Sequence, residues 1–203
     1  NSDFAFVKGL VLSLDYDNNQ GFFGTIDYTL QNAVGTASDP YQAQNAISNN
    51  QLPEIQIVPL NWDQVHTINA TLGYSNKIYG NYSLIARFGS GLPYTPESSE
   101  DISSLTYNSS RKPITNSVDF RASKNFVFQK LNFTLFARIK NLFDTLNENI
   151  VYNDSGQAGY TRYKDLAKAQ NTDESINTVD QWFENETFYS NPRRIEIGLN
   201  IDF

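Results

Sequence analysis

The sequence predicts an all-β fold of antiparallel strands, and three observations predict it. Apolar and polar residues alternate along seven separate segments, which is the period of a strand with one apolar and one polar face. The connections between these segments alternate strictly between short and long. The chain is also polar as a whole, with a mean hydropathy of -0.47, although each segment carries a complete apolar row.

The first two segments predict a hairpin. In residues 9–16, the even positions carry three leucines and then Tyr16, and they form one face of a strand; the odd positions, which include Ser13 and Asp15, form the other face. Residues 22–31 alternate in the same way. Between them, residues 18–21 read Asn-Asn-Gln-Gly, and these residue types favour turns.

Five further strands are predicted. Residues 67–74 and 81–88 are separated by a short connection that starts at Ser75-Asn76-Lys77. Residues 118–126, where Lys124 is out of the pattern, lead through a tight turn near Gln129 to residues 131–140. The last strand covers residues 195–203 and ends on Phe203.

The connections distinguish between classes of β protein. Those after the second, fourth and sixth strands cover about residues 32–66, 89–116 and 141–192, whereas the others are only a few residues long. Compact soluble domains seldom carry three loops of that length. Bacterial outer-membrane barrels combine tight periplasmic turns with long extracellular loops. The pattern therefore predicts an antiparallel transmembrane β-barrel segment of about seven strands, located in the bacterial cell outer membrane.

The two strand faces then have opposite surroundings. The aliphatic row through Leu135 and Ile197 is predicted to contact lipid, and aromatic residues gather at two levels, as in membrane barrels. The level near the short turns holds Tyr16, Phe22, Tyr74, Tyr79, Phe126 and Phe128, and the opposite level holds Tyr28, Phe88 and Phe143. Side chains predicted to face the lumen or a plug are Arg87, Asp119, Arg121, Arg138, Lys140 and Glu196. We expect Asp119 and Glu196 to form an ion ladder with Arg121, Arg138 and Arg194.

Several segments resemble motifs of TonB-dependent outer-membrane receptors. Residues 61–67 (NWDQVHT), which contain Trp62, Asp63 and His66, resemble the W-D-Q-R-H-T entry to a strand, with valine in place of the usual arginine. Residues 89–96 (GSGLPYTP) resemble the S-G-x-P-Y-T-P element of that family. Asn141, Leu142, Phe143 and Asp144 resemble its v-x-N-L-F-D element. Residues 155–156 (SG) and the strand that begins 192–194 (PRR) are similar to the Bacteroidetes-type members.

This resemblance implies a fold and a function. Such receptors enclose an N-terminal plug in a barrel of about 22 strands, bind a substrate at the cell surface and import it actively. Because residues 1–203 contain no plug, we expect the whole chain to be the C-terminal part of the barrel. The implied partners are the remainder of the barrel and the plug, the TonB complex acting through that plug, outer-membrane lipid and lipopolysaccharide, the barrel-assembly machinery and a surface lipoprotein. The assembly machinery is expected to recognise the terminal strand through Ile197, Leu199, Ile201 and Phe203.

No catalytic, cofactor or metal site is predicted, and we expect no enzymatic activity. The chain has no cysteine and a single histidine, His66, so thiol catalysis is excluded and zinc lacks ligands. His66 is expected to form a hydrogen bond at the barrel rim. The net charge of -7 argues against a nucleic-acid partner.

Two alternatives remain open. A small autonomous outer-membrane barrel, acting as an anchor or adhesin, would need an eighth strand in residues 51–59 or 159–167. A soluble β-barrel or sandwich that binds a ligand would pack the aliphatic row in a dry centre.

Overall fold

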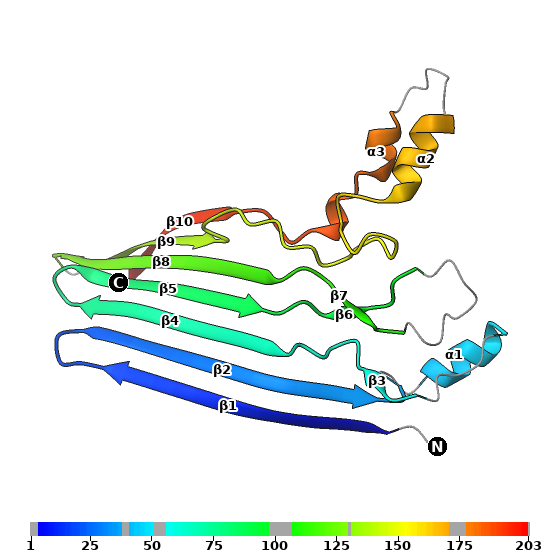
Figure 1. Cartoon of the computed structure of the whole chain (residues 1–203). Coiled ribbons are helices and arrows are strands. Elements are labelled where there is room, and N and C mark those ends of the chain that lie inside the picture. Colours follow the sequence, from blue (N-terminus) through cyan, green and yellow to red (C-terminus); the bar gives the residue numbers. More distant parts are fainter. Residues whose placement is uncertain are drawn as a thin grey trace.

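The computed structural model describes residues 4–37, 41–50, 56–97, 107–129, 131–170 and 178–202. Seven long strands form one antiparallel sheet in which each pairs with the next along the chain (Figure 1). Their bounds are β1 Ala5–Asp17, β2 Phe22–Gly35, β4 His66–Asn76, β5 Gly80–Gly89, β8 Thr115–Phe128, β9 Leu131–Lys140 and β10 Arg194–Asp202. The prediction of an all-β fold with seven antiparallel strands is confirmed.

Several strands are longer than predicted. The first begins at Ala5 rather than Gly9, because its pairing with β2 continues to Ala5 opposite Gly35. The backbone ladder therefore extends beyond the segment in which leucine alternates with polar residues. Lys124 lies within β8, opposite Leu135, with its Nζ atom 5.3 Å from the centre of the Phe126 ring.

All shorter elements lie in the long connections, which emerge at one end of the sheet while the short turns lie at the other (Figure 1). These elements are α1 Gln42–Ser48, β3 Val58–Pro59, β6 Pro93–Tyr94, β7 Ser110–Arg111, α2 Arg162–Gln170, α3 Val179–Phe183 and the 3₁₀-helix η2 Glu186–Phe188. The predicted alternation of short and long connections is confirmed.

The segments considered for an eighth strand do not supply one where they are described. Residues 56–59 contribute only the two-residue β3, which extends the edge of β2 at Val34 and Gly35. Residues 162–167 belong to helix α2. Residues 51–55 lie outside the described part of the chain.

The strand register gathers the aliphatic side chains on one face of the sheet. Residues directly opposite each other in neighbouring strands point to the same side. One such row runs through Leu14, Ile26, Ala70, Ala86 and Val118. We call this side the apolar face. Its exposed leucine and isoleucine side chains are Leu10, Leu12, Leu14, Ile26, Leu30, Leu72, Leu84, Leu135, Ile195, Ile197, Leu199 and Ile201.

The opposite side carries most of the charged residues together with serine, threonine and asparagine, and we call it the polar face. Asp27 lies there between Ser13 and Asn69, and Arg121 lies opposite Arg138, which is itself opposite Glu196. The six side chains predicted to face a lumen all belong to this face. Their common side follows from the register.

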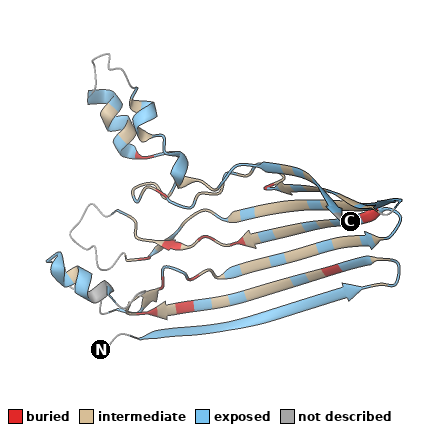
Figure 2. Ribbon diagram, turned by 180° about the vertical axis from the view of Figure 1, so that it is seen from behind, coloured by how far each residue is buried: buried red, intermediate tan, exposed pale blue. Residues whose placement is uncertain are grey.

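No second layer covers either face of the sheet within the described residues. The elements that pack on one another are neighbouring strands, β2 with β3, β6 with β7, and α2 with α3. Figure 2 accordingly shows few buried positions along the seven long strands. Leu135 is 47% exposed and Ile197 is 75% exposed. The aliphatic row is therefore not packed in a dry centre.

The described sheet is open rather than closed into a barrel. Strands β1 and β10 are its edges, and each pairs with one long strand only. In the predicted terminal strand, Ile197, Leu199 and Ile201 all lie on the apolar face of β10, while Phe203 lies outside the described residues. The barrel part of the predicted fold class thus goes beyond what this sheet establishes.

Candidate functional site

The largest fully buried side chains belong to the long connections rather than to the sheet. Leu60, Asp63 and Thr161 are the largest side chains that are fully buried, and Val151 and Ala158 are buried nearby in sequence. Ala33, also buried, lies close to the end of β2 from which the first long connection starts. We call the packed part of the three long connections the loop layer.

An ion pair between Asp63 and Arg111 joins two of these connections. The Arg111 Nη2 atom lies 2.5 Å from Oδ2 of Asp63, whose side chain is 1% exposed. The other carboxylate oxygen of Asp63 accepts a hydrogen bond from the backbone N–H of Ala33 at 2.6 Å. Arg111 Nη1 also donates to the backbone oxygens of Asp63 and Gly91, at 2.7 and 3.2 Å. One buried carboxylate therefore connects β2, the first long connection and the second.

Asn108 makes a second link between the same connections. Its side-chain nitrogen donates to the backbone oxygen of Pro59 at 2.7 Å and to Oδ1 of Asn61 at 2.8 Å. Its φ of 52° is a left-handed conformation that asparagine tolerates better than most residues. Nearby, a Cβ on Gly91 would lie 1.6 Å from the backbone oxygen of Lys112, so only glycine fits there.

The residues Asn141 to Asp144 tie the start of the third long connection to its end. Asn141 donates its backbone N–H to Oδ1 of Asp119 at 3.0 Å, and its side-chain nitrogen donates to the oxygen of Asn191 at 3.2 Å. Asp144 accepts a hydrogen bond from the backbone N–H of Arg193 at 2.7 Å. Both Asn141 and Asp144 have positive φ, at 52° and 56°. This segment therefore forms the turn from which β10 is positioned.

The second and third connections also touch each other directly. Lys112 donates from Nζ to the backbone oxygen of Asn149 at 2.7 Å, and the backbone N–H of Glu97 donates to Asn153 at 2.9 Å. The Tyr163 hydroxyl donates to the Glu97 carboxylate, and this hydrogen bond raises the pKa of Tyr163. The three connections are thus joined into one layer by polar contacts.

Helices α2 and α3 extend from this layer as a pair, away from the sheet (Figure 1). Asp180 of α3 lies 2.8 Å from the ammonium groups of both Lys164 and Lys168 of α2. These contacts, first that with Lys164, lower the pKa of Asp180, and the same contact raises the pKa of Lys164. Trp182 of α3 is 80% exposed.

The remaining motif residues lie at the sheet end of the loop layer. Trp62 is 45% exposed beside the buried Asp63, and Phe143 is 70% exposed. His66 begins β4, where its Nδ1 atom and the Tyr28 hydroxyl are hydrogen-bonded at 2.9 Å. The backbone N–H of His66 donates to Oγ of Ser90 at 3.0 Å. The expected hydrogen bond of His66 is therefore present, at the junction of loop and strand.

The predicted ion ladder on the polar face is only partly correct. Arg87 pairs with Asp119 at 3.1 Å and Arg194 pairs with Glu196 at 2.9 Å. Arg121 and Arg138, which were expected to bind these carboxylates, lie directly opposite each other and form no ion pair within the described part of the chain. Their expected partners are already engaged by Arg87 and Arg194.

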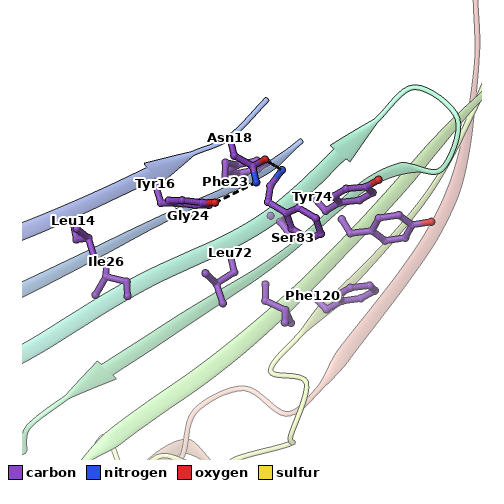
Figure 3. A pocket seen from close by; sticks show the side chains of 14 residues that line it. Leu14, Tyr16, Asn18, Phe23, Gly24, Ile26, Leu72, Tyr74, Ser83 and Phe120 are labelled. Atoms are coloured by element: carbon purple, nitrogen blue, oxygen red, sulfur yellow. Dashed lines mark hydrogen bonds between the residues drawn. The ribbon is translucent and has the colours of Figure 1, made fainter. Parts of the chain in front are cut away.

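An open hollow of about 710 Å³ lies on the apolar face near the short turns (Figure 3). Leu14, Ile26, Leu72 and Phe120 line it, and the Tyr16 hydroxyl at its rim accepts a hydrogen bond from the Asn18 side chain at 3.2 Å. Its lining is aliphatic and aromatic, with few polar groups.

Sequence reasoning missed two residues of the loop layer. Arg111 and Asn108 carry the contacts between the first and second connections, yet no periodic pattern or motif marks them. Asp63 could have indicated that a cationic partner exists, because a carboxylate buried in a packed turn needs a cation or several hydrogen-bond donors.

Comparison with known proteins assigns no family. No family model matches the chain, and neither a curated protein nor a solved structure is significantly similar to it. Among the described residues, no helix is both long and apolar enough to span a membrane, and no group of three or more candidate ligands could hold a metal ion.

Replacing Asp63 with alanine should loosen the loop layer. The substitution leaves the Arg111 guanidinium and the Ala33 N–H without their acceptor. We therefore expect the free energy of unfolding to fall by about 2–4 kcal/mol. This is somewhat less than for a fully buried ion pair, because Arg111 is partly exposed. Denaturant unfolding in detergent gives the free energy, and hydrogen exchange should speed up at Ala33 and Leu60. The exposed Glu186→Gln serves as the control, and equal stability of the two variants would contradict this role.

The α2–α3 contact should depend on pH at both extremes. Because the pKa of Asp180 is lowered, the ionised carboxylate stabilises the α2–α3 contact fully at pH values above the ordinary pKa of 3.8. This stabilisation disappears as the pH falls through the lowered pKa. Because the pKa of Lys164 is raised, its contribution is complete below 10.5 and disappears as the pH rises through the raised value. Fluorescence of Trp182 in a Trp62→Phe background should report the acid transition. An Asp180→Asn variant should already give the acid signal at neutral pH, and an unchanged acid transition in that variant would refute the assignment.

Proposed function

We propose that this chain forms part of the wall and the outer mouth of a TonB-dependent transporter in the bacterial outer membrane. Such a transporter binds its substrate at the cell surface and imports it actively. The observation that carries the proposal is the apolar face, which is continuous over seven strands and uncovered by any described element. In water, partial exposure of its aliphatic side chains costs on the order of 10 kcal/mol. Lipid hydrocarbon removes that cost.

Strand lengths agree with a membrane-spanning sheet. The seven strands have between 9 and 14 residues, and a tilted strand needs about 9–11 residues to cross the hydrocarbon layer. Strands in small soluble sheets are shorter on average, at about 5–6 residues. The extra residues of β2 and β8 reach into the loop layer or the turns.

Aromatic side chains support the same orientation. Near the short turns, the rings of Phe22 and Tyr74 are 4.6 Å apart, and Tyr16 lies at the rim of the apolar hollow in Figure 3. At the loop end, Tyr28 binds His66 and Phe143 is exposed. Aromatic belts at both interfaces are typical of outer-membrane barrels. The long connections then face the cell exterior and the short turns face the periplasm.

The open edges require further strands. In lipid, the unpaired backbone groups along β1 and β10 would each cost several kcal/mol, so a membrane-embedded sheet has to close. The proposal therefore includes the remaining strands of a barrel of about 22 and a plug against the polar face. The transporter assignment itself rests on the resemblance of the segments around Asp63, Gly91 and Asn141, which are the segments that build the loop layer.

The soluble sandwich is less well supported. It needs a second sheet over Leu135 and Ile197, and no described element supplies one.

Cysteine labelling in intact cells tests location and orientation together. The chain has no cysteine, so Ala169→Cys in α2 and Lys77→Cys in the β4–β5 turn each introduce a unique thiol. A membrane-impermeant maleimide should label the Ala169 variant in intact cells, and the Lys77 variant only after the outer membrane is permeabilised. Equal labelling in lysates is the control. Labelling of the Lys77 variant in intact cells, or protection of the Ala169 variant, would overturn the proposal.

A further inference from the structure

Charge is distributed unevenly over the polar face. Its β1–β2 side carries the carboxylates Asp15 and Asp27, and no basic residue of these two strands lies opposite them. Its β8–β9 side carries a group of cations: Arg121, Arg138 and Lys140. The polar face thus has an acidic side and a basic side.

The carboxylates next to these three cations are already occupied. Asp119 accepts from Arg87 with Oδ2 at 3.1 Å and from the backbone N–H of Asn141 with Oδ1 at 3.0 Å. Glu196 binds Nε of Arg194 at 2.9 Å. Within the residues that the structure describes, no ion pair reaches Arg121, Arg138 or Lys140.

Arg121 and Arg138 bring two like charges together, and Glu196, which lies directly opposite Arg138 in β10, offsets this repulsion only in part because it already binds Arg194. The two residues are direct cross-strand partners in β8 and β9, and like charges in such positions destabilise a sheet. Arg138 is otherwise stacked on its neighbour Phe136, with the guanidinium carbon 4.9 Å from the ring centre. An enclosed surrounding would strengthen the repulsion, because a lower effective dielectric constant screens it less.

Two hollows adjoin this pair. The first, of about 230 Å³, is lined by Arg121, Arg138, Lys140 and the flanking carboxylates. The second, of about 390 Å³, is also lined by Arg121 and Arg138, and extends across the sheet to Phe23 on β2, with Phe136 in its wall. We call the second hollow, which has a mixed polar and aromatic lining, the groove.

We propose that Arg121 and Arg138, assisted by Lys140, form a carboxylate-binding site for an acidic side chain of a polypeptide segment that lies along this groove. A guanidinium fork binds a carboxylate through two parallel hydrogen bonds, and an anion between two such forks cancels their repulsion. The extension of the groove to Phe23 favours a peptide chain, which can place an apolar side chain there. This inference rests on the proposed function, in which the polar face is enclosed.

Peptide binding to the full chain in detergent micelles tests the site. The probes are a fluorescent peptide with alternating glutamate and leucine and the same peptide with glutamine in place of glutamate, measured by anisotropy at low ionic strength. We expect the glutamate peptide to bind about tenfold tighter or better. Arg121→Gln/Arg138→Gln should remove this difference, whereas Arg193→Gln, in the loop layer, should keep it.

Further measurements separate the alternatives. Arg121→Gln/Arg138→Gln removes the repulsion between the two arginines, so its denaturant midpoint of unfolding should be at or above that of the wild type. A loss of peptide binding in this variant would then not be caused by a loss of folding. If that variant unfolds, Arg121→Lys/Arg138→Lys keeps the charges without the forks and should bind the glutamate peptide more weakly. Two results would overturn the proposal. One is equal binding of the glutamate and glutamine peptides, and the other is displacement of the labelled glutamate peptide by citrate as effectively as by the unlabelled glutamate peptide. None of these outcomes depends on membrane orientation, so a failure here is distinct from a failure of the labelling experiment.

Discussion

Register is the constraint on which the rest of this structure depends. Side chains alternate with a period of two, so a slip of one residue in any pair of strands would send its aliphatic row to the other side. The pairings of Leu14 with Ile26 and of Leu135 with Leu199 show the same register at opposite sides of the sheet. Because this register holds across all seven strands, the molecule has two chemically different faces. The apolar face needs an apolar covering, which our proposal assigns to lipid, and the polar face needs water or a charged partner.

The loop layer is held by a different kind of interaction. Its stability comes from buried polar contacts, above all the carboxylate of Asp63 with Arg111 and the turn at Asn141, rather than from a large apolar core. These contacts hold the loop layer together at the end of a sheet that has no core of its own. The apolar side chains of the sheet are not buried by any described element, whereas the loop layer buries side chains of its own, such as Leu60 and Asp63.

Local patterns predicted the sheet well, because alternation and turn residues act over a few positions. They did not predict the partner of Asp63, since Arg111 lies 48 residues further along the chain and enters through tertiary packing. Residues 159–167 were considered for a strand, although residues 162–170 are rich in helix formers such as leucine, alanine, lysine and glutamine; α2 is also held by its contacts with Asp180. The ion ladder was only partly correct for a similar reason. The face and the charges were predicted, but the pairing of Asp119 with Arg87 depends on side-chain reach and on the backbone N–H of Asn141. The closure that our proposal requires would depend on strands other than the seven of this sheet, which no local pattern describes.

Spin-label accessibility along β9 in bilayer vesicles tests the sidedness of the sheet most directly. Single labels from Asn132 to Lys140 would be probed with oxygen, which concentrates in lipid, and with a water-soluble nickel chelate. The account predicts a period of two in both signals, with oxygen maxima at Phe133, Leu135 and Ala137 and nickel maxima at Thr134, Phe136 and Arg138. Nickel maxima at Leu135, or equal access of the nickel chelate to both faces, would contradict it.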